Sequence, residues 1–181
     1  ELQYGYHDPS NHYHYRMVAC GFEEIKSGER FVLNVNHLRS KRGTGDESNA
    51  KRMVNVDSLL VMLNKIEQEQ LFGDADILLV GDYNCYTQEQ PIQRIVQAGY
   101  EDILMRHDST GYSYVYHSEA GYLDRAFASP TIAAQVKAAH PYHLNADYFY
   151  SRGYKRRLDK TMFRYADHDP ILISIQLTGD K

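Results

Sequence analysis

The feature that most constrains this chain is a short apolar run, Asp76–Val80, with polar residues directly after it. A continuous run of large aliphatic residues is typical of a strand that is buried on both faces. Such a strand needs packing on each side, and the chain offers helices for it. Apolar residues recur at helical spacing from Val56 to Ile66, and a second helix is expected over Pro91–Ala98. The sequence therefore predicts an α/β or α+β fold with a layered sheet core.

Other strands are expected on either side of this run. Met17–Ile25 and Phe31–Asn36 predict a hairpin, closed by the turn-like segment Lys26–Glu29. The remaining expected elements are strands over Tyr112–Tyr116, Tyr122–Ala128 and Ile171–Leu177, a short helix over Pro130–Ala139, and an exposed loop over Ser40–Ala50. No internal repeat or domain linker interrupts this order.

Composition excludes several classes of protein. With 43% hydrophobic and 24% charged residues among 181, the chain is not disordered, collagenous or a coiled coil, and no apolar run is long enough to cross a bilayer. The net charge of −4 argues against a partner held by bulk electrostatics, although a local basic patch is enough to bind nucleic acid. Cys20 and Cys85 match no metal-binding spacing and fix no compartment.

Acids, amides and imidazoles gather at four places where a predicted strand gives way to a loop. Strand ends often carry function, because the sheet fixes the backbone while the loop leaves the side chains accessible. The four segments are Asn34–His37, Gly81–Asn84, Tyr122–Arg125 and Ala166–Pro170. We expect them to converge on a single cleft.

In this order, the four segments resemble the endonuclease/exonuclease/phosphatase family. One such tetrapeptide is weak evidence, whereas four in order over nearly the whole chain are strong. Within the family, the chain is most similar to the bacterial extracellular nucleases. The segments that suggest this branch are Tyr112–Val115, Gly121–Asp124, His143–Asp147 and Phe163–Pro170.

The resemblance implies a fold and a reaction. The fold is the C-terminal portion of a four-layer α/β/β/α sandwich. The reaction is hydrolysis of a phosphodiester in DNA, or RNA as well, with Mg²⁺ as cofactor and Mn²⁺ or Ca²⁺ as alternatives. The family's early asparagine strand and metal-binding glutamate are not visible before Met17. Residues 1–181 are therefore expected to be a partial domain whose partner is its own N-terminal part, and to be weakly active or inactive alone.

The resemblance also implies catalytic roles. Asp82 is expected to orient or deprotonate the attacking water, and Asn84 to hydrogen-bond the phosphate oxygens. His168 is expected to face the scissile phosphate with Asp124 as its carboxylate partner, and His37 to be a second histidine beside the phosphate. A carboxylate that fixes a histidine tautomer raises the pKa of that histidine, so these residue types suit an anionic substrate.

Three further residues receive roles from the resemblance. Asp167 is expected to be a metal ligand, since hard oxygen donors suit magnesium. Arg125 stands where the extracellular nucleases usually carry a histidine, and it is expected to form a salt bridge or touch phosphate. Asn145 is likewise expected to bind substrate.

Other interpretations remain open from sequence. Gly81–Asn84 and Asp167–Pro170 are also common turn sequences. The substrate could be a phosphomonoester or a lipid headgroup, or the chain could be a non-catalytic binding module. The nearest-looking relatives are exported, which suggests a secreted or cell-envelope protein, but the first residues carry no leader. The histidines at positions 7, 12 and 14 resemble a metal-binding tract, but a solvated terminal segment or an edge strand explains them as well. Lys155–Arg157 is expected to be a solvated loop, although it could bind a phosphate backbone near a cleft.

Overall fold

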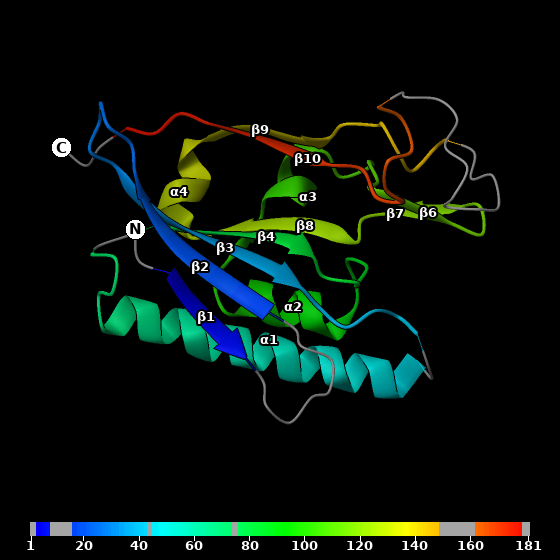
Figure 1. The fold of residues 1–181 in the computed structure, drawn as a ribbon, viewed down its shortest axis with the longest axis horizontal. Coiled ribbons are helices and arrows are strands. Elements are labelled where there is room, and N and C mark those ends of the chain that lie inside the picture. Colours follow the sequence, from blue (N-terminus) through cyan, green and yellow to red (C-terminus); the bar gives the residue numbers. More distant parts are fainter. Residues whose placement is uncertain (1–2, 8–15, 43–44, 74–75, 149–161, 179–181) are drawn as a thin grey trace.

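The computed structural model describes residues 3–7, 16–42, 45–73, 76–148 and 162–178. Its central feature is a six-stranded sheet (Figure 1). In spatial order the strands are β1 (Gln3–His7), β2 (Arg16–Glu23), β3 (Arg30–His37), β4 (Asp76–Asp82), β8 (Asp124–Ala128) and β5 (Glu101–Asp102). β3 and β4 are parallel, and the other neighbouring pairs are antiparallel. The predicted α/β class is confirmed, and so is the hairpin, which β2 and β3 form.

Helices α1 (Gly45–Gln68) and α2 (Gln90–Gln97) cover one face of the sheet (Figure 1). α1 is the crossover that joins β3 to its parallel neighbour β4. Ile77 and Leu79 of β4 pack into the core on the side of α1, whereas Leu78 packs into a second core on the opposite face. β4 is therefore buried on both faces, as its apolar run predicts.

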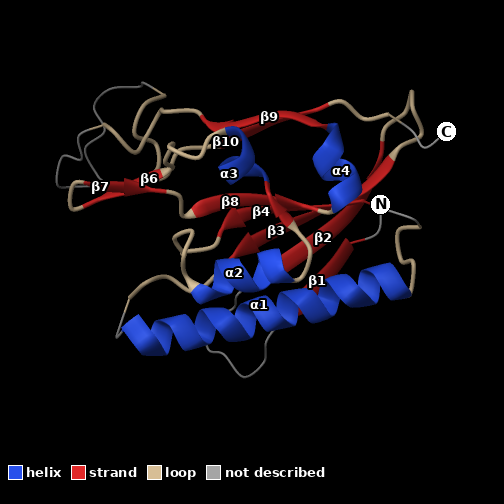
Figure 2. Cartoon of the chain, turned by 180° about the vertical axis from the view of Figure 1, so that it is seen from behind, coloured by secondary structure: helices blue, strands red, loops and turns tan. Residues whose placement is uncertain are grey.

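The opposite face is covered in part. Helices α3 (Ile103–His107) and α4 (Pro130–Gln135) lie between the large sheet and a two-stranded sheet of β9 (Val136–Pro141) and β10 (Ile171–Ile175) (Figure 2). Over β2 and β3, apolar side chains on this face remain between 39% and 46% exposed; they are Val18, Phe22 and Val35. The covering layer thus protects the β4–β8 side of the sheet better than the β2–β3 side.

Two boundaries differ from the sequence expectation. α1 begins at Gly45, inside the expected loop, because Ser48 and Arg52 face inward and bond to each other, with Arg52 Nη1 3.0 Å from Ser48 Oγ. The helix expected over Pro130–Ala139 ends at Gln135, where β9 begins and pairs with β10. Long-range pairing has overridden the local helical preference of an alanine-rich segment.

The strands expected over Tyr112–Tyr116 and Tyr122–Ala128 are both present, starting at Tyr114 and Asp124, but they do not pair with each other. β6 (Tyr114–Tyr116) instead pairs with β7 (Glu119–Gly121) through a two-residue turn, and β8 joins the large sheet beside β4. Both turn residues have positive φ, as the tight turns that suit a hairpin require. Among the described helices, none has the length and apolar character to span a membrane.

Candidate active site

Three strands bring their polar ends together at one edge of the large sheet. His37 is the last residue of β3 and pairs with Asp82, the last residue of β4. Asp82 in turn lies opposite Asp124, the first residue of β8. Because the strands are hydrogen-bonded neighbours, their register alone places these three side chains at one edge.

Gly81 makes this close approach of strands possible. Its φ is +134°, and a Cβ added there would lie 1.9 Å from the carbonyl oxygen of Asn36 on β3. Any side chain would therefore force β3 and β4 apart directly beside His37 and Asp82. The glycine of the Gly81–Asn84 motif is thus required by the geometry of the strand ends.

Asp82, Asp124 and His168 form the centre of the site. His168 Nδ1 lies 2.7 Å from Asp124 Oδ2, the contact expected from the sequence. One ligand atom from each of the three residues lies within 4.8 Å of the others. His37 stands at the rim, largely exposed, with its Nε2 3.5 Å from Asp82 Oδ2.

Two of the central groups, Asp82 and His168, have pKa values shifted by their surroundings. Burial and the charge of Asp124 raise the pKa of Asp82 above its ordinary value. Burial lowers the pKa of His168. The hydrogen bond with Asp124 and the negative charges of Asp124, Asp82 and Asp167 outweigh burial and raise this pKa overall. The site therefore favours a protonated imidazole beside two crowded carboxylates.

A cleft of about 750 Å³ opens over this centre. The part of its lining that we call the cationic wall consists of Ser40, Lys41 and Arg42, which follow β3, and Lys41 also pairs with Glu89. Another part of the lining, the aromatic wall, consists of tyrosines. The full lining is His37, Ser40, Lys41, Arg42, Asp82, Asn84, Tyr86, Tyr114, Tyr116, Leu123, Asp124, Asp167 and His168. The four predicted strand ends thus contribute to one cleft, and the cationic and aromatic walls are additions that the motifs did not indicate.

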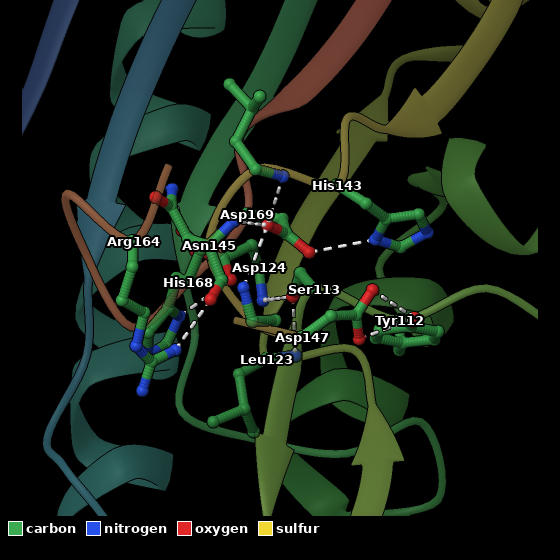
Figure 3. A network of polar contacts seen from close by, with 12 residues as sticks. Tyr112, Ser113, Leu123, Asp124, His143, Asn145, Asp147, Arg164, His168 and Asp169 are labelled. Carbon is green, nitrogen blue, oxygen red and sulfur yellow. Dashed lines mark hydrogen bonds and ion pairs between the residues drawn. The ribbon is translucent and has the colours of Figure 1, made fainter. Parts of the chain in front are cut away.

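A polar network behind the cleft holds the loop that carries His168 (Figure 3). The buried Asp169 carboxylate accepts three backbone N–H bonds from residues 144–146 and lies 2.8 Å from His143 Nδ1. Ser113 Oγ accepts from the backbone N–H groups of Leu123 and Asp124, and its carbonyl accepts from Asp169 N. The positions of Asp124 and His168 are therefore fixed through shared partners, which sequence reasoning missed because Asp169 and Ser113 read as ordinary turn and strand residues.

Asn145 and Arg125 lie behind the cleft rather than on it. Asn145 Nδ2 donates to the His168 carbonyl at 2.7 Å, and its Oδ1 accepts from Tyr165 N, so the side chain positions this loop. Arg125 is 1% exposed and forms a salt bridge of 2.9 Å to Asp102. Neither side chain lines the cleft, and the structure shows the salt bridge for Arg125; a contact of either residue with substrate stays a prediction.

Asn84 and Asp167 both line the cleft, as residues expected to contact phosphate and metal should. The Asn84 amide donates to Asp82 Oδ2 at 2.9 Å and to the Leu38 carbonyl at 3.0 Å, so both of its N–H groups are engaged within the site. Asp167 is exposed on the wall and stands outside the group formed by Asp82, Asp124 and His168. The roles of Asn84 and Asp167 toward phosphate and metal stay predictions.

Cys85 and the N-terminal histidines lie outside the four segments that the sequence singles out for the site. Cys85 follows Asn84 and is fully buried, and burial raises the pKa of its thiol to about 12, which makes it a packing residue rather than a nucleophile. His7 ends the edge strand β1. His12, His14 and Lys155–Arg157 lie outside the described residues.

The donor set at the centre fits a divalent cation. Two carboxylates with one imidazole supply negative charge and hard oxygen donors, and the pKa of Asp82 is raised first by burial and then by the charge of Asp124. Asp82 and Asp124 would hold the ion, and His168 would be a third ligand only when its imidazole is neutral. Oxygen donors suit Mg²⁺, Ca²⁺ and Mn²⁺, whereas the imidazole favours a transition metal, so the site itself does not select one ion.

Comparison with known proteins gives a structural likeness. No protein-family model matches the chain, and no curated protein sequence matches it. An endonuclease/exonuclease/phosphatase family protein from Bacteroides thetaiotaomicron matches with a TM-score of 0.60 and 17% identity, over 88% of this chain and 55% of that chain. The mannosyl-6-phosphatase of the same organism matches with a TM-score of 0.62 and 17% identity, over 91% and 58%.

A third match is the 3′ phosphatase NExo from Neisseria, bound to a product DNA hairpin. It has a TM-score of 0.62 and 11% identity, over 97% of this chain and 70% of that chain. This chain thus spans little more than half the length of the two Bacteroides structures. At such low identity the likeness shows the fold, and we conclude that the chain has a mixed α/β fold that matches part of the endonuclease/exonuclease/phosphatase architecture.

Proposed function

We propose that this chain carries the later catalytic residues of a metal-dependent phosphodiesterase that hydrolyses nucleic acid, DNA in the first place. The observation that supports this most is the Asp82–Asp124–His168 cluster, at the floor of a cleft with one cationic wall. A bound divalent cation would neutralise the phosphate and lower the pKa of its bound water. The family and its extracellular-nuclease branch, like export from the cell, are part of this proposal.

The chain's own residues have separable tasks in this reaction. Asp124 would fix the orientation of the His168 ring and keep it protonated. His168 could then stabilise the phosphate or donate a proton from its ring. Asp82, close to both, would accept a proton from the attacking water, and its raised pKa supports this role. His37 and the cationic wall would bind the flanking charge of the substrate.

The test is hydrolysis of plasmid and single-stranded DNA by the full-length protein with Mg²⁺ or Mn²⁺. We expect cleavage by the wild type and a loss of about 10²–10⁴ in rate for His168→Ala. Asp57→Asn is the matched control, because Asp57 lies on the exposed surface of α1 and pairs with Arg94. Equal cleavage by wild type and His168→Ala would overturn the proposal.

A second candidate is a phosphomonoesterase acting on a sugar phosphate or a lipid headgroup. Two structural matches support this candidate: the mannosyl-6-phosphatase and the 3′ phosphatase, each with a TM-score of 0.62. A panel of DNA, RNA, hexose 6-phosphates and inositol phosphates separates the two. Faster release of phosphate from a monoester than cleavage of any diester would replace the first candidate with this one.

A further inference from the structure

The tyrosine wall of the cleft is an ordered row. Tyr114 and Tyr116 are two residues apart on β6, so both rings lie on the same face of the strand. Their planes are 12° apart with centroids separated by 6.3 Å, and the Tyr114 ring centroid lies 4.6 Å from that of His168. The row therefore leads from the catalytic imidazole toward solvent, where Tyr116 is 56% exposed.

The row is held in place by its own hairpin. The turn residues His117 and Ser118 have φ values of 51° and 68°, which fixes a tight two-residue connection between β6 and β7. A backbone bridge also joins Tyr114 to His168. The row is thus ordered before any ligand arrives, which lowers the entropic cost of binding on it.

Core packing does not account for these rings. Tyr83 and Tyr122 are 0% and 4% exposed and fill the interior, whereas Tyr116 stands at the mouth of a polar cleft. The cationic wall carries Lys41 and Arg42, both exposed; Lys41 forms an ion pair with Glu89, and its Nζ lies 4.8 Å from the centroid of the Tyr86 ring. Cationic and aromatic groups therefore line the same cleft from different elements.

We propose that this cleft takes a single strand of nucleic acid, with an unpaired base stacked on the Tyr114–Tyr116 row and backbone phosphates along Lys41 and Arg42. In a duplex the faces of each base are covered by its neighbours, so a base must be unpaired to stack on a protein ring. The proposal rests on the proposed function and narrows its substrate to single-stranded nucleic acid.

Binding by the full-length protein tests this without catalysis. Fluorescence anisotropy is measured in EDTA, with a labelled single strand of about ten nucleotides, a strand of the same length made of abasic sites, and a hairpin duplex. We expect the base-bearing strand to bind roughly tenfold tighter than the other two. Tyr116→Ala should remove this preference, and Tyr116→Phe should keep it.

Two further variants separate stacking from charge. Tyr142→Ala, an exposed tyrosine that does not line the cleft, should leave binding unchanged. Arg42→Ala should weaken all three ligands alike and reduce the slope of log affinity against log salt by roughly 0.7. Thermal denaturation confirms that each variant is folded.

The inference is overturned if the duplex binds as tightly as the base-bearing strand, or if Tyr116→Ala retains the wild-type preference. Its failure is distinguishable from failure of the proposed function. Loss of base preference with His168-dependent cleavage of a small activated diester would overturn only this inference. Equal cleavage of that diester by wild type and His168→Ala would overturn the function itself.

Discussion

Asp124 acts on His168 through a single short hydrogen bond, and this gives a pH-dependent prediction. Asp124→Asn removes the charge that holds the pKa of His168 above its ordinary value. If protonated His168 is the active form, activity falls as pH rises through this pKa. The variant should therefore lose activity at a lower pH than the wild type, with a lower maximum as well.

The measurement is the pH profile of kcat/KM for the full-length protein on a DNA substrate. The matched control is Asp57→Asn, which removes a carboxylate from an exposed pair on α1. An Asp124→Asn profile with its alkaline limb unmoved would show that Asp124 does not act through the protonation of His168.

Asp169 gives a second prediction, on stability. Burial raises the pKa of Asp169, but the hydrogen bond with His143 and three backbone N–H donors outweigh it, so the pKa is lower in the folded chain than in the unfolded one. Its stabilisation is therefore complete above the unfolded pKa of about 4 and is lost as pH falls through the lower folded value.

Asp169→Asn should lower the free energy of unfolding at neutral pH by about 2–3 kcal/mol, because three backbone donors then share a neutral acceptor. Urea unfolding followed by circular dichroism, repeated from pH 7 to acid, measures both effects. The difference between wild type and variant should shrink as the pH falls. A constant difference at every pH would contradict the electrostatic part of the argument.

At the residue scale, the sequence predicts the proposed catalytic residues better than the residues that position them. His37, Asp82, Asp124 and His168 follow recognisable strand ends, and the structure brings them together. Arg125 could not be placed from sequence, since a guanidinium after a site aspartate suits a substrate contact as well as a salt bridge. Only tertiary packing decides, and here it buries Arg125 against Asp102.

The β6–β7 hairpin yields a prediction at the scale of the element. Ser118 adopts a φ of 68°, which costs a non-glycine residue about 1 kcal/mol. Ser118→Gly should relieve this cost and slow hydrogen exchange of the hairpin amides. Ser109→Gly is the matched control, because Ser109 is exposed but its φ is not positive, so glycine there only increases the freedom of the unfolded chain.

Which elements are predictable from sequence depends on how much of their signal is local. β4 is recognisable because its apolar run needs burial on both faces. β9 is not, because Val136–Pro141 is alanine-rich and forms a strand only by pairing with β10, about thirty residues away. The start of α1 also escapes prediction, since it depends on the burial of Arg52, a residue type that is usually exposed.

For the molecule as a whole, the central cluster predicts modest metal affinity. Asp82, Asp124 and His168 offer three donors, and His168 already bonds to Asp124 through Nδ1. In calorimetric titration of the 181-residue chain we expect weak binding of Mg²⁺ and tighter binding of Mn²⁺, because an imidazole suits a transition metal better. Asp82→Asn should weaken both, and Asp57→Asn neither. Unchanged Mn²⁺ binding by Asp82→Asn would place the ion elsewhere.

The global arrangement was predictable in outline, since ordered motifs at strand ends imply a shared edge and a shared cleft. Its walls were not predictable. Lys41 and Arg42 lie in a segment that is expected to be an exposed loop, and no pattern distinguishes Tyr116 among the 16 tyrosines of the chain. Their meeting depends on the hairpin β6–β7 folding back beside His168, which no local pattern encodes.

Cys85 makes opening of the segment after β4 chemically observable. Its thiol is buried with a pKa raised to about 12, so it can react with a thiol reagent only when this segment opens. The segment carries Asn84 and directly follows Asp82, the last residue of β4. In a Cys20→Ser background the labelling rate of this single thiol should report how often that segment opens. Added Mn²⁺ should slow the labelling if the ion holds Asp82 in place. The labelling rate of Cys85, which has no role in the proposed reaction, would then measure how firmly Asp82 and Asn84 are held.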